Sequence, residues 1–298
     1  MRFTFLGAVG AALLVAMSGA HAQQQFTVFA SIVDGTGAPV TSLQPSDLRV
    51  RENGADASVV KVEPVDWPTK LQILVDNGIG LGGNNLVHLQ NGVRSLIDAL
   101  PAAVEVTLVA TAPQPRFLVR GTADREAITK GLALLAYDSG AGRFVESLNE
   151  ATQRIERDKG NFFHAIVSVG TNSGDRVVLD RDVKSIMQRL QQRPTTVHVV
   201  LFNGGPTSAS GGVNQSQVGL AVTELTKGRY ENINSGTRIA SLLPELGALV
   251  AKSHERQSHQ FRITAQRPAG ASGPVAQVSM GAGGGNTVSS LSFDGRIP

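Results

Sequence analysis

Residues 70–257 alternate between short apolar runs and amphipathic segments, and this alternation constrains the fold more than any other feature of the chain. Apolar runs of strand length occur at 71–76, 104–110, 116–120, 162–169 and 197–202. Apolar residues three or four positions apart predict helices at 86–100, 124–135, 144–157, 182–190, 215–225 and 239–253. Strands that alternate with helices favour a mostly parallel sheet covered on both faces. We therefore expect an α/β domain with a doubly wound, Rossmann-like sheet, because crossover connections are right-handed.

Both ends of this region are flanked by segments that alternate with the two-residue period of β-strands. The N-terminal segment, 23–68, predicts a small β unit with strands at 26–33, 48–51 and 59–62. The C-terminal segment, 258–298, predicts further strands at 261–266, 275–280 and 288–293. Neither set alone buries much apolar surface, so we expect the two sets to pack together.

Residues 1–22 have the pattern of a secretory signal peptide. Arg2 precedes a nearly continuous apolar run at 3–17, and the small residues Ala20 and Ala22 follow it. The run is about 15 residues long and a membrane-spanning helix needs roughly 20, so cleavage near Ala22 is favoured over a retained anchor. We expect a secreted or periplasmic protein whose mature chain has no transmembrane segment.

The chain has no cysteine, which excludes disulfides, thiolate metal sites and a lipid anchor on cysteine. The formal net charge is only +3, and no Lys/Arg run is present that could follow a phosphate backbone. Nucleic acid is therefore not an expected partner.

The loop after the first α/β strand contains Gly78, Gly80 and Gly83 in a G-x-G-x-x-G spacing. A dinucleotide site is disfavoured, because the next strand ends without an acidic residue to hold the ribose and Asp76 would repel a pyrophosphate. The glycines could instead form only a tight turn, with Asp76 capping the following helix or lying near its N-terminus.

A third interpretation comes from resemblance to a family. Residues 26–76 resemble the bacterial VWFA-related proteins, through Val33-Asp34-Gly35, Pro39-Val40, Leu43, Asp47-Leu48, Glu52-Asn53-Gly54 and an apolar strand that ends at Asp76. Segments at 122–124, 162–171, 197–202 and 261–280 resemble later parts of that family, in the same order. The resemblance implies a von Willebrand factor type A-like domain at 69–257.

The resemblance also implies a position for a metal-ion-dependent adhesion site. The family's D-x-S-x-S motif falls on Asp76, Gly78 and Gly80, its middle threonine falls near Gly142, and its final aspartate falls on Thr171. Mg²⁺ needs about six oxygen ligands, and glycine side chains supply none. We therefore expect a degenerate site with no cofactor. Mg²⁺ is disfavoured and, if bound at all, would be held by Asp76.

Loops at the carboxyl ends of parallel strands bind ligands in sheets of this class. We therefore expect a binding or adhesion module whose partner is a protein in the envelope or the extracellular space, captured largely without metal. The candidate contact residues lie in the loops after the strands and are Asp76, Asn77, Gly78, Gly80, Gly142, Thr171, Asn172 and Asn203.

The sequence favours a protein that is not an enzyme. It contains neither a G-x-S-x-G nor an H-E-x-x-H motif. His164 and His198 lie in apolar strands, and we expect both to be structural. An exported hydrolase with a triad assembled across the same loops remains an alternative, because triad residues need only meet in space. A scaffold in an envelope complex is a second alternative.

Overall fold

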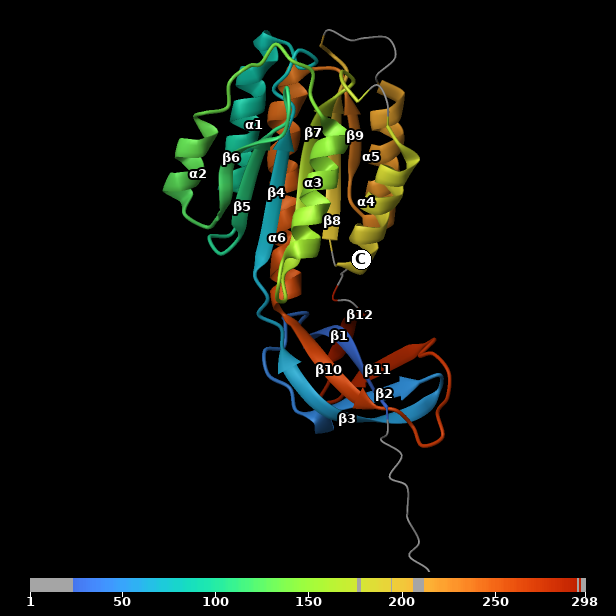
Figure 1. Cartoon of the computed structure of the whole chain (residues 1–298). Helices are drawn as coiled ribbons and strands as arrows, with labels where there is room; N and C mark the ends of the chain where they lie inside the picture. Colours follow the sequence, from blue (N-terminus) through green and yellow to red (C-terminus); the bar gives the residue numbers. More distant parts are fainter. Residues whose placement is uncertain (1–23, 176–177, 194, 206–211, 294, 296–298) are drawn as a thin grey trace, which may run out of the picture.

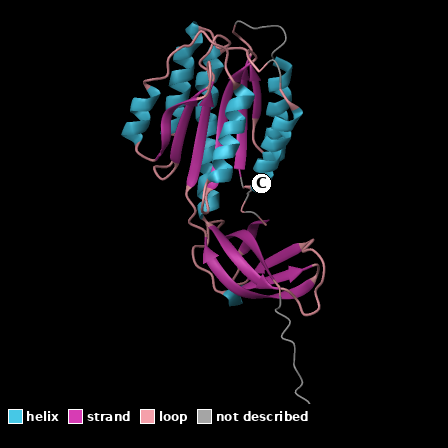
Figure 2. Ribbon diagram, viewed as in Figure 1, coloured by secondary structure: helices cyan, strands magenta, loops and turns pink. Residues whose placement is uncertain are grey.

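The structure is a computed structural model that describes residues 24–175, 178–193, 195–205, 212–293 and 295. Within these residues it contains two six-stranded sheets. One sheet carries helices on both faces and forms the upper part of the molecule in Figure 1, whereas the lower part consists almost entirely of strands, as Figure 2 shows. We name them the α/β unit and the β unit. The expected signal peptide, 1–22, lies outside the described residues.

The sheet of the α/β unit has five parallel strands and one antiparallel edge strand. Its order is β6-β5-β4-β7-β8-β9, and β6 is the strand that runs antiparallel to its neighbour β5. The strands are β4 (Thr69–Val75), β5 (Glu105–Ala110), β6 (Arg116–Thr122), β7 (Phe163–Thr171), β8 (Thr195–Phe202) and β9 (Tyr230–Ile233). All nine residues of β7 are buried, as expected of a central strand covered on both faces.

In the part of the chain that the structure describes, six helices cover this sheet, and each face has its own apolar core. The helices are α1 (Leu86–Asp98), α2 (Arg125–Leu132), α3 (Phe144–Arg157), α4 (Asp180–Gln192), α5 (Gly212–Thr226) and α6 (Gly236–Ser258). Side chains of α1, α2 and α6 bury one face, and side chains of α3, α4 and α5 bury the other. The predicted α/β class is therefore confirmed.

Local sequence signals account for several of these elements. In α3 the buried residues Phe144, Leu148, Ala151 and Ile155 recur every three or four positions, so one stripe of the helix faces the sheet. Helix α2 begins where the sequence predicts, because the Asp124 carboxylate accepts the N–H groups of the next turn.

The β unit combines strands from both ends of the chain. Its strands are β1 (Gln25–Val33), β2 (Leu48–Glu52), β3 (Ala55–Pro64), β10 (Gln260–Gln266), β11 (Val278–Ala282) and β12 (Thr287–Ser292). The order is β11-β2-β3-β10-β1-β12, and all neighbours are antiparallel. Because β10 lies between β1 and β3, the whole α/β unit is inserted in the chain between two paired strands. Two 3₁₀ turns, Pro45–Asp47 and Gly83–Asn85, complete the described elements.

Aromatic side chains fill the junction between the two units. Trp67 lies between Phe29 of β1 and Phe163 of β7, with ring centroids 5.2 Å from each. Val65 completes this buried cluster. Within the β unit, the buried carboxylate of Glu52 pairs with the guanidinium of Arg267, which joins β2 to the segment after β10.

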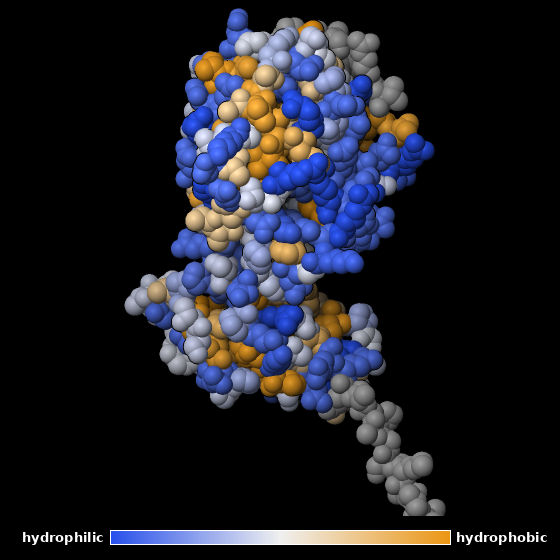
Figure 3. All heavy atoms as spheres, turned by 60° about the vertical axis from the view of Figure 1, so that its left-hand side comes forward, coloured by the Kyte–Doolittle hydropathy of each residue, from blue (hydrophilic) through white to orange (hydrophobic). Residues whose placement is uncertain are grey.

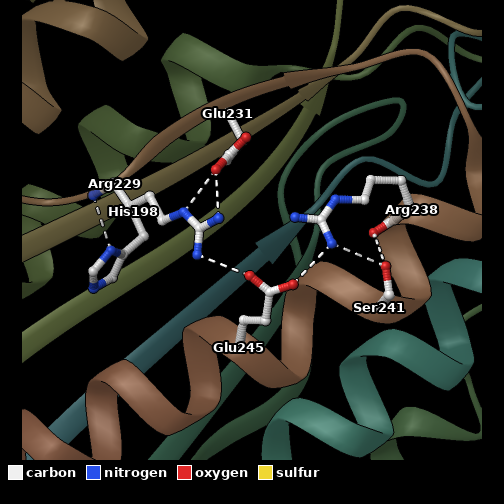
Figure 4. A network of polar contacts seen from close by, with 6 residues as sticks. All are labelled: His198, Arg229, Glu231, Arg238, Ser241 and Glu245. Carbon is white, nitrogen blue, oxygen red and sulfur yellow. Dashed lines mark hydrogen bonds and ion pairs between the residues drawn. The ribbon is translucent and has the colours of Figure 1, made fainter.

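The edge strand β9 has no counterpart among the predicted strands, because its four residues include a single buried apolar side chain. Charged contacts tie it to α6, as Figure 4 shows. Arg229, directly before β9, donates to Glu231 at 2.7 Å and to Glu245 of α6 at 2.9 Å. Arg238 reaches the other oxygen of Glu245 at 2.8 Å. Tertiary contacts therefore fix this strand.

Candidate ligand-binding edge

The loops after β4, β5 and β7 meet at the carboxyl edge of the α/β sheet. The backbone N–H of Asp76 donates to Val169 of β7 at 2.8 Å. Ile79 donates to Gly140 at 2.9 Å. Arg143 donates to Thr111, directly after β5, at 3.0 Å. The loop of Asp76 and the loop before α3 are therefore hydrogen-bonded to each other and to the ends of neighbouring strands, whereas Asn203 donates to Ile233 of β9.

The carboxylate of Asp76 is the centre of this edge, and it is only 2 % exposed. Its Oδ1 accepts the backbone N–H of Gly78 at 2.8 Å, and its Oδ2 accepts the hydroxyl of Thr171 at 2.5 Å. Burial raises the pKa of Asp76, while the hydrogen bonds from Thr171 and Gly78 oppose that rise.

Asp76 does not cap a helix, which corrects one of the interpretations of this loop. The residue that precedes α1 is Asn85, and α1 itself starts only at Leu86. Asp76 instead holds the tight turn at Gly78, where the N–H of Leu81 also donates to the Gly78 carbonyl at 3.0 Å. The tight-turn part of that interpretation agrees with the structure.

Three glycines allow the loops to close over Asp76, and we call them the glycine seam: Gly78, Gly80 and Gly142. A Cβ on Gly80 would lie 2.0 Å from the hydroxyl oxygen of Ser173. A Cβ on Gly142 would lie 2.1 Å from Oδ2 of Asp76, and one on Gly78 would lie 2.4 Å from a backbone oxygen. The positions where the family carries hydroxyl ligands are therefore filled by neighbouring atoms.

These residues do not fit a Mg²⁺ site. Among the described residues, Asp76 is the carboxylate that contacts the seam, and the hydroxyls of Thr171 and Ser173 are hydrogen-bonded to each other at 2.8 Å. Octahedral Mg²⁺ needs about six oxygen ligands, and the three glycines of the seam supply no side-chain oxygen. Across the described ranges, no group of three or more His, Asp or Glu side chains is placed to hold a metal ion.

Two nearby aspartates could have replaced the missing ligands, and both are engaged elsewhere. Asp175 accepts the N–H of Val145 at 3.1 Å, at the N-terminus of α3. Burial raises the pKa of Asp175 to about 6, and backbone hydrogen bonds from Val145 and Phe144 limit that rise. Asp138 accepts the N–H of Gly140 at 2.7 Å and shapes the loop before the seam.

Most of the candidate contact residues are buried. Asn77 is 1 % exposed and braces two loops, because it donates to the carbonyl of Ala136 at 2.7 Å and accepts the N–H of Ala112 at 3.2 Å. The glycine seam, Asp76 and Thr171 are buried as well. Solvent reaches Asn172 and Asn203, which are half-exposed, and their exposed neighbours Ile79 and Arg143. Fewer of the candidate contact residues are therefore accessible to a partner than the sequence predicts.

Sequence reasoning did not single out Ser173, which packs against Gly80 and bonds Thr171. The sequence signal was a second hydroxyl residue two positions after Thr171. The contact of Ser173 with Gly80 could not be predicted from it, because Gly80 lies almost a hundred positions earlier in the chain. Residues 206–211 of the glycine- and serine-rich loop after β8 lie outside the described part of the chain.

The two strand histidines are buried. Burial lowers the pKa of His164 and of His198 to about 4, so both imidazoles are neutral at pH 7. His198 accepts the backbone N–H of Arg229 at 3.0 Å, as Figure 4 shows. His164 lies near the start of β7, at the opposite end of the sheet from Asp76. Neither histidine supports a triad at the carboxyl edge.

No protein-family model and no curated protein sequence matches the chain. Solved structures do match it. A von Willebrand factor type A protein from Catenulispora acidiphila is 10% identical, covering 92% of this chain and 74% of that chain, with a TM-score of 0.52. The pilus adhesin SpaC from Lactobacillus rhamnosus GG, in its open conformation, is 11% identical, covering 76% of this chain and 36% of that chain, with a TM-score of 0.51.

The chain therefore has the fold of a von Willebrand factor type A domain, as the sequence resemblance predicted. At such low identity this likeness concerns the fold alone. None of the helices in the described ranges combines the length and the apolar character needed to cross a bilayer.

Proposed function

We propose that this chain is an exported interaction module that captures a protein partner in the cell envelope or outside the cell, without a divalent cation. The observation that carries this proposal is the closed glycine seam, where a buried and hydrogen-bonded Asp76 stands in the place of a metal centre. The strand order β6-β5-β4-β7-β8-β9 supports a doubly wound, Rossmann-like arrangement, whose loops bind at the carboxyl edge.

The partner would contact the accessible rim of this edge. Ile79 is 42 % exposed on the loop after β4, so it offers an apolar contact at this rim. Asn172 and Asn203 lie on the loops after β7 and β8, and Arg143 precedes α3. The buried members of the edge, including Asn77, hold these loops in place. The similarity to a protein described as a pilus adhesin supports an interaction role.

Affinity capture tests the proposal. The bait is the chain 23–298, exposed to envelope and culture-supernatant extracts once with Mg²⁺ and once with EDTA. We expect one protein to be retained equally under both conditions. Loss of that protein in EDTA would contradict the metal-free mechanism, and the absence of any retained protein would contradict an interaction module.

A pair of variants tests the location of the contact. Asn172→Arg adds bulk and charge at the rim, and we expect it to weaken capture at least about tenfold, as loss of a central contact does. Gln188→Arg makes the same addition on the exposed side of α4 and should leave capture unchanged. Equal capture by both variants would place the contact elsewhere on the molecule.

A further inference from the structure

The sheet of the α/β unit has an unusual polar corner near the amino ends of its strands. Lys70 of β4 pairs in register with Glu105 of β5 and with His164 of β7, and Gln72 pairs with Thr107. Strands buried on both faces are normally near-continuous apolar runs. The opposite face of β4 follows that rule, because its Leu71 and Ile73 are fully buried. The polar residues therefore mark a part of the α3 face where polar contacts replace apolar packing, and Gln72 donates to the carbonyl of Ala151 in α3 at 3.1 Å.

A hollow of about 390 Å³ lies over this polar floor. One wall is the last turn of α3, with Arg154 and Arg157, and the other is β6, with Phe117 and Arg120. The volume falls within the range of small-molecule pockets. Figure 3 turns the β6 side of the molecule forward, where strongly hydrophilic and apolar side chains lie next to each other on the α/β unit.

A bulge in β6 shapes this wall. Val106 pairs with Thr122, but Leu108 pairs with Val119, so Arg120 and Gly121 together oppose a single residue of β5. In a regular strand, residues three positions apart face opposite sides. A second irregularity at Leu118, between the pairs Val109–Phe117 and Leu108–Val119, brings Arg120 to the side of Phe117, with its guanidinium carbon 4.4 Å from the ring centroid.

The hollow carries an excess of positive charge. Its lining holds four cationic side chains and two carboxylates, and one of these carboxylates, Asp158, is paired with Lys70 at 3.0 Å. Arg154 donates to Gln72 at 2.8 Å. Arg120 and Arg157 are exposed, and neither forms an ion pair with a residue in the described ranges.

Gly121 leaves space at the floor of the hollow. A Cβ there would make only ordinary contacts, at 3.4 Å from the hydroxyl oxygen of Thr107 and 3.7 Å from a carboxylate oxygen of Glu105. Its φ angle is not in the left-handed region, so packing and backbone geometry both allow a side chain. The glycine therefore keeps a space open that a larger residue would fill.

We propose that this hollow binds a small organic oxyanion, a carboxylate- or phosphate-bearing molecule, held by the guanidinium groups of Arg120 and Arg157. Guanidinium forks match the oxygens of both anionic groups. The body of the ligand lies over Thr107 and Gly121. The site is near the opposite ends of the strands from Asp76, so it is independent of the function proposed for the carboxyl edge.

Isothermal titration of the chain 23–298 tests this site, with inorganic phosphate in one series and citrate in another, at constant ionic strength. We expect one of the two probes to bind saturably at one site, which also identifies the preferred anionic group. Arg120→Gln combined with Arg157→Gln should weaken that binding at least about tenfold, because two charged hydrogen-bond donors are lost.

Two further variants separate a built site from general charge attraction. Arg94→Gln combined with Arg181→Gln removes the same charge from exposed positions on α1 and α4 and should leave the affinity within about twofold. Gly121→Val occupies part of the floor of the hollow without changing any charge and should weaken binding at least about tenfold. The proposal is overturned if neither probe saturates, if both double variants weaken binding equally, or if Gly121→Val binds as the unmodified chain does.

Discussion

The two ends of the α/β sheet show opposite uses of small and polar residues. At the carboxyl edge, the glycine seam lets the backbone close so tightly over Asp76 that its carboxylate is buried. Near the amino ends, polar side chains on β4 and β5 leave a charged hollow beside α3. The comparison teaches that a few glycines can close the edge where proteins of this fold usually bind ligands. Function therefore has to be inferred from the residues of each site and not from the fold.

Closing the carboxyl edge should make its glycines intolerant of substitution, and this is the largest effect that we expect. Gly80→Ser restores a hydroxyl at a family ligand position, but its Cβ would collide with Ser173 and Thr171. We expect a loss of about 3 kcal/mol in the free energy of unfolding, at the upper end of overpacking costs. Urea denaturation measures it.

Gly83→Ser is the matched control for this experiment, because nothing lies within 4 Å of a Cβ at Gly83. We expect its effect to stay within about 0.5 kcal/mol. Both variants are also unfolded with Mg²⁺ present. Stabilisation of Gly80→Ser by Mg²⁺ would show that the seam can open to form a metal site, against the closed edge described above.

The carboxyl edge should also respond to pH through Asp175. The pKa of Asp175 is raised to about 6 from 3.8, so the folded state binds its proton more tightly than the unfolded state. This stabilisation is complete below pH 3.8 and is lost as pH rises through about 6. Asp175→Asn should remove roughly 2 kcal/mol of that pH-dependent change.

Unfolding free energies measured between those two pH values, with the exposed Asp66→Asn as control, provide the test. The asparagine oxygen can still accept the N–H of Val145, so the cap on α3 is retained. Identical pH profiles for the unmodified chain and Asp175→Asn would show that this carboxyl group is not the titrating residue.

Substitution of the glycine in the hollow should be tolerated, unlike substitution of a glycine in the seam. We expect it to have the smallest effect on stability of the three changes considered. Gly121→Val places a β-branched residue in a strand where space is available. We expect unchanged stability or a gain of up to about 1 kcal/mol, because the unfolded chain loses conformational freedom. Thermal unfolding measures this change, and a marked loss would mean that the floor is already packed.

Much of the fold was predictable, because it depends on local patterns. The apolar spacing in α3 and the cap at Asp124 fixed those helices, and the buried run at 162–169 indicated the central strand. Strand β9 was not predictable, since its short sequence lacks an apolar pattern and its position depends on Arg229 and Glu245. The sequence also indicated the hollow, because polar Lys70 and Gln72 alternate with apolar residues in β4. A prediction that treats this strand as wholly buried overlooks that alternation.

By itself, the sequence determined which chemical groups stand at the family's five ligand positions: one aspartate, one threonine and glycines in place of hydroxyl ligands. Tertiary structure alone decided that these glycines bring Ser173 and Thr171 into contact with the loop of Asp76, and that Asn77 is a buried brace. It also decided that a bulge turns Arg120 toward Phe117. Composition is local and can be read along the chain, whereas closure, burial and register arise only when distant segments pack together.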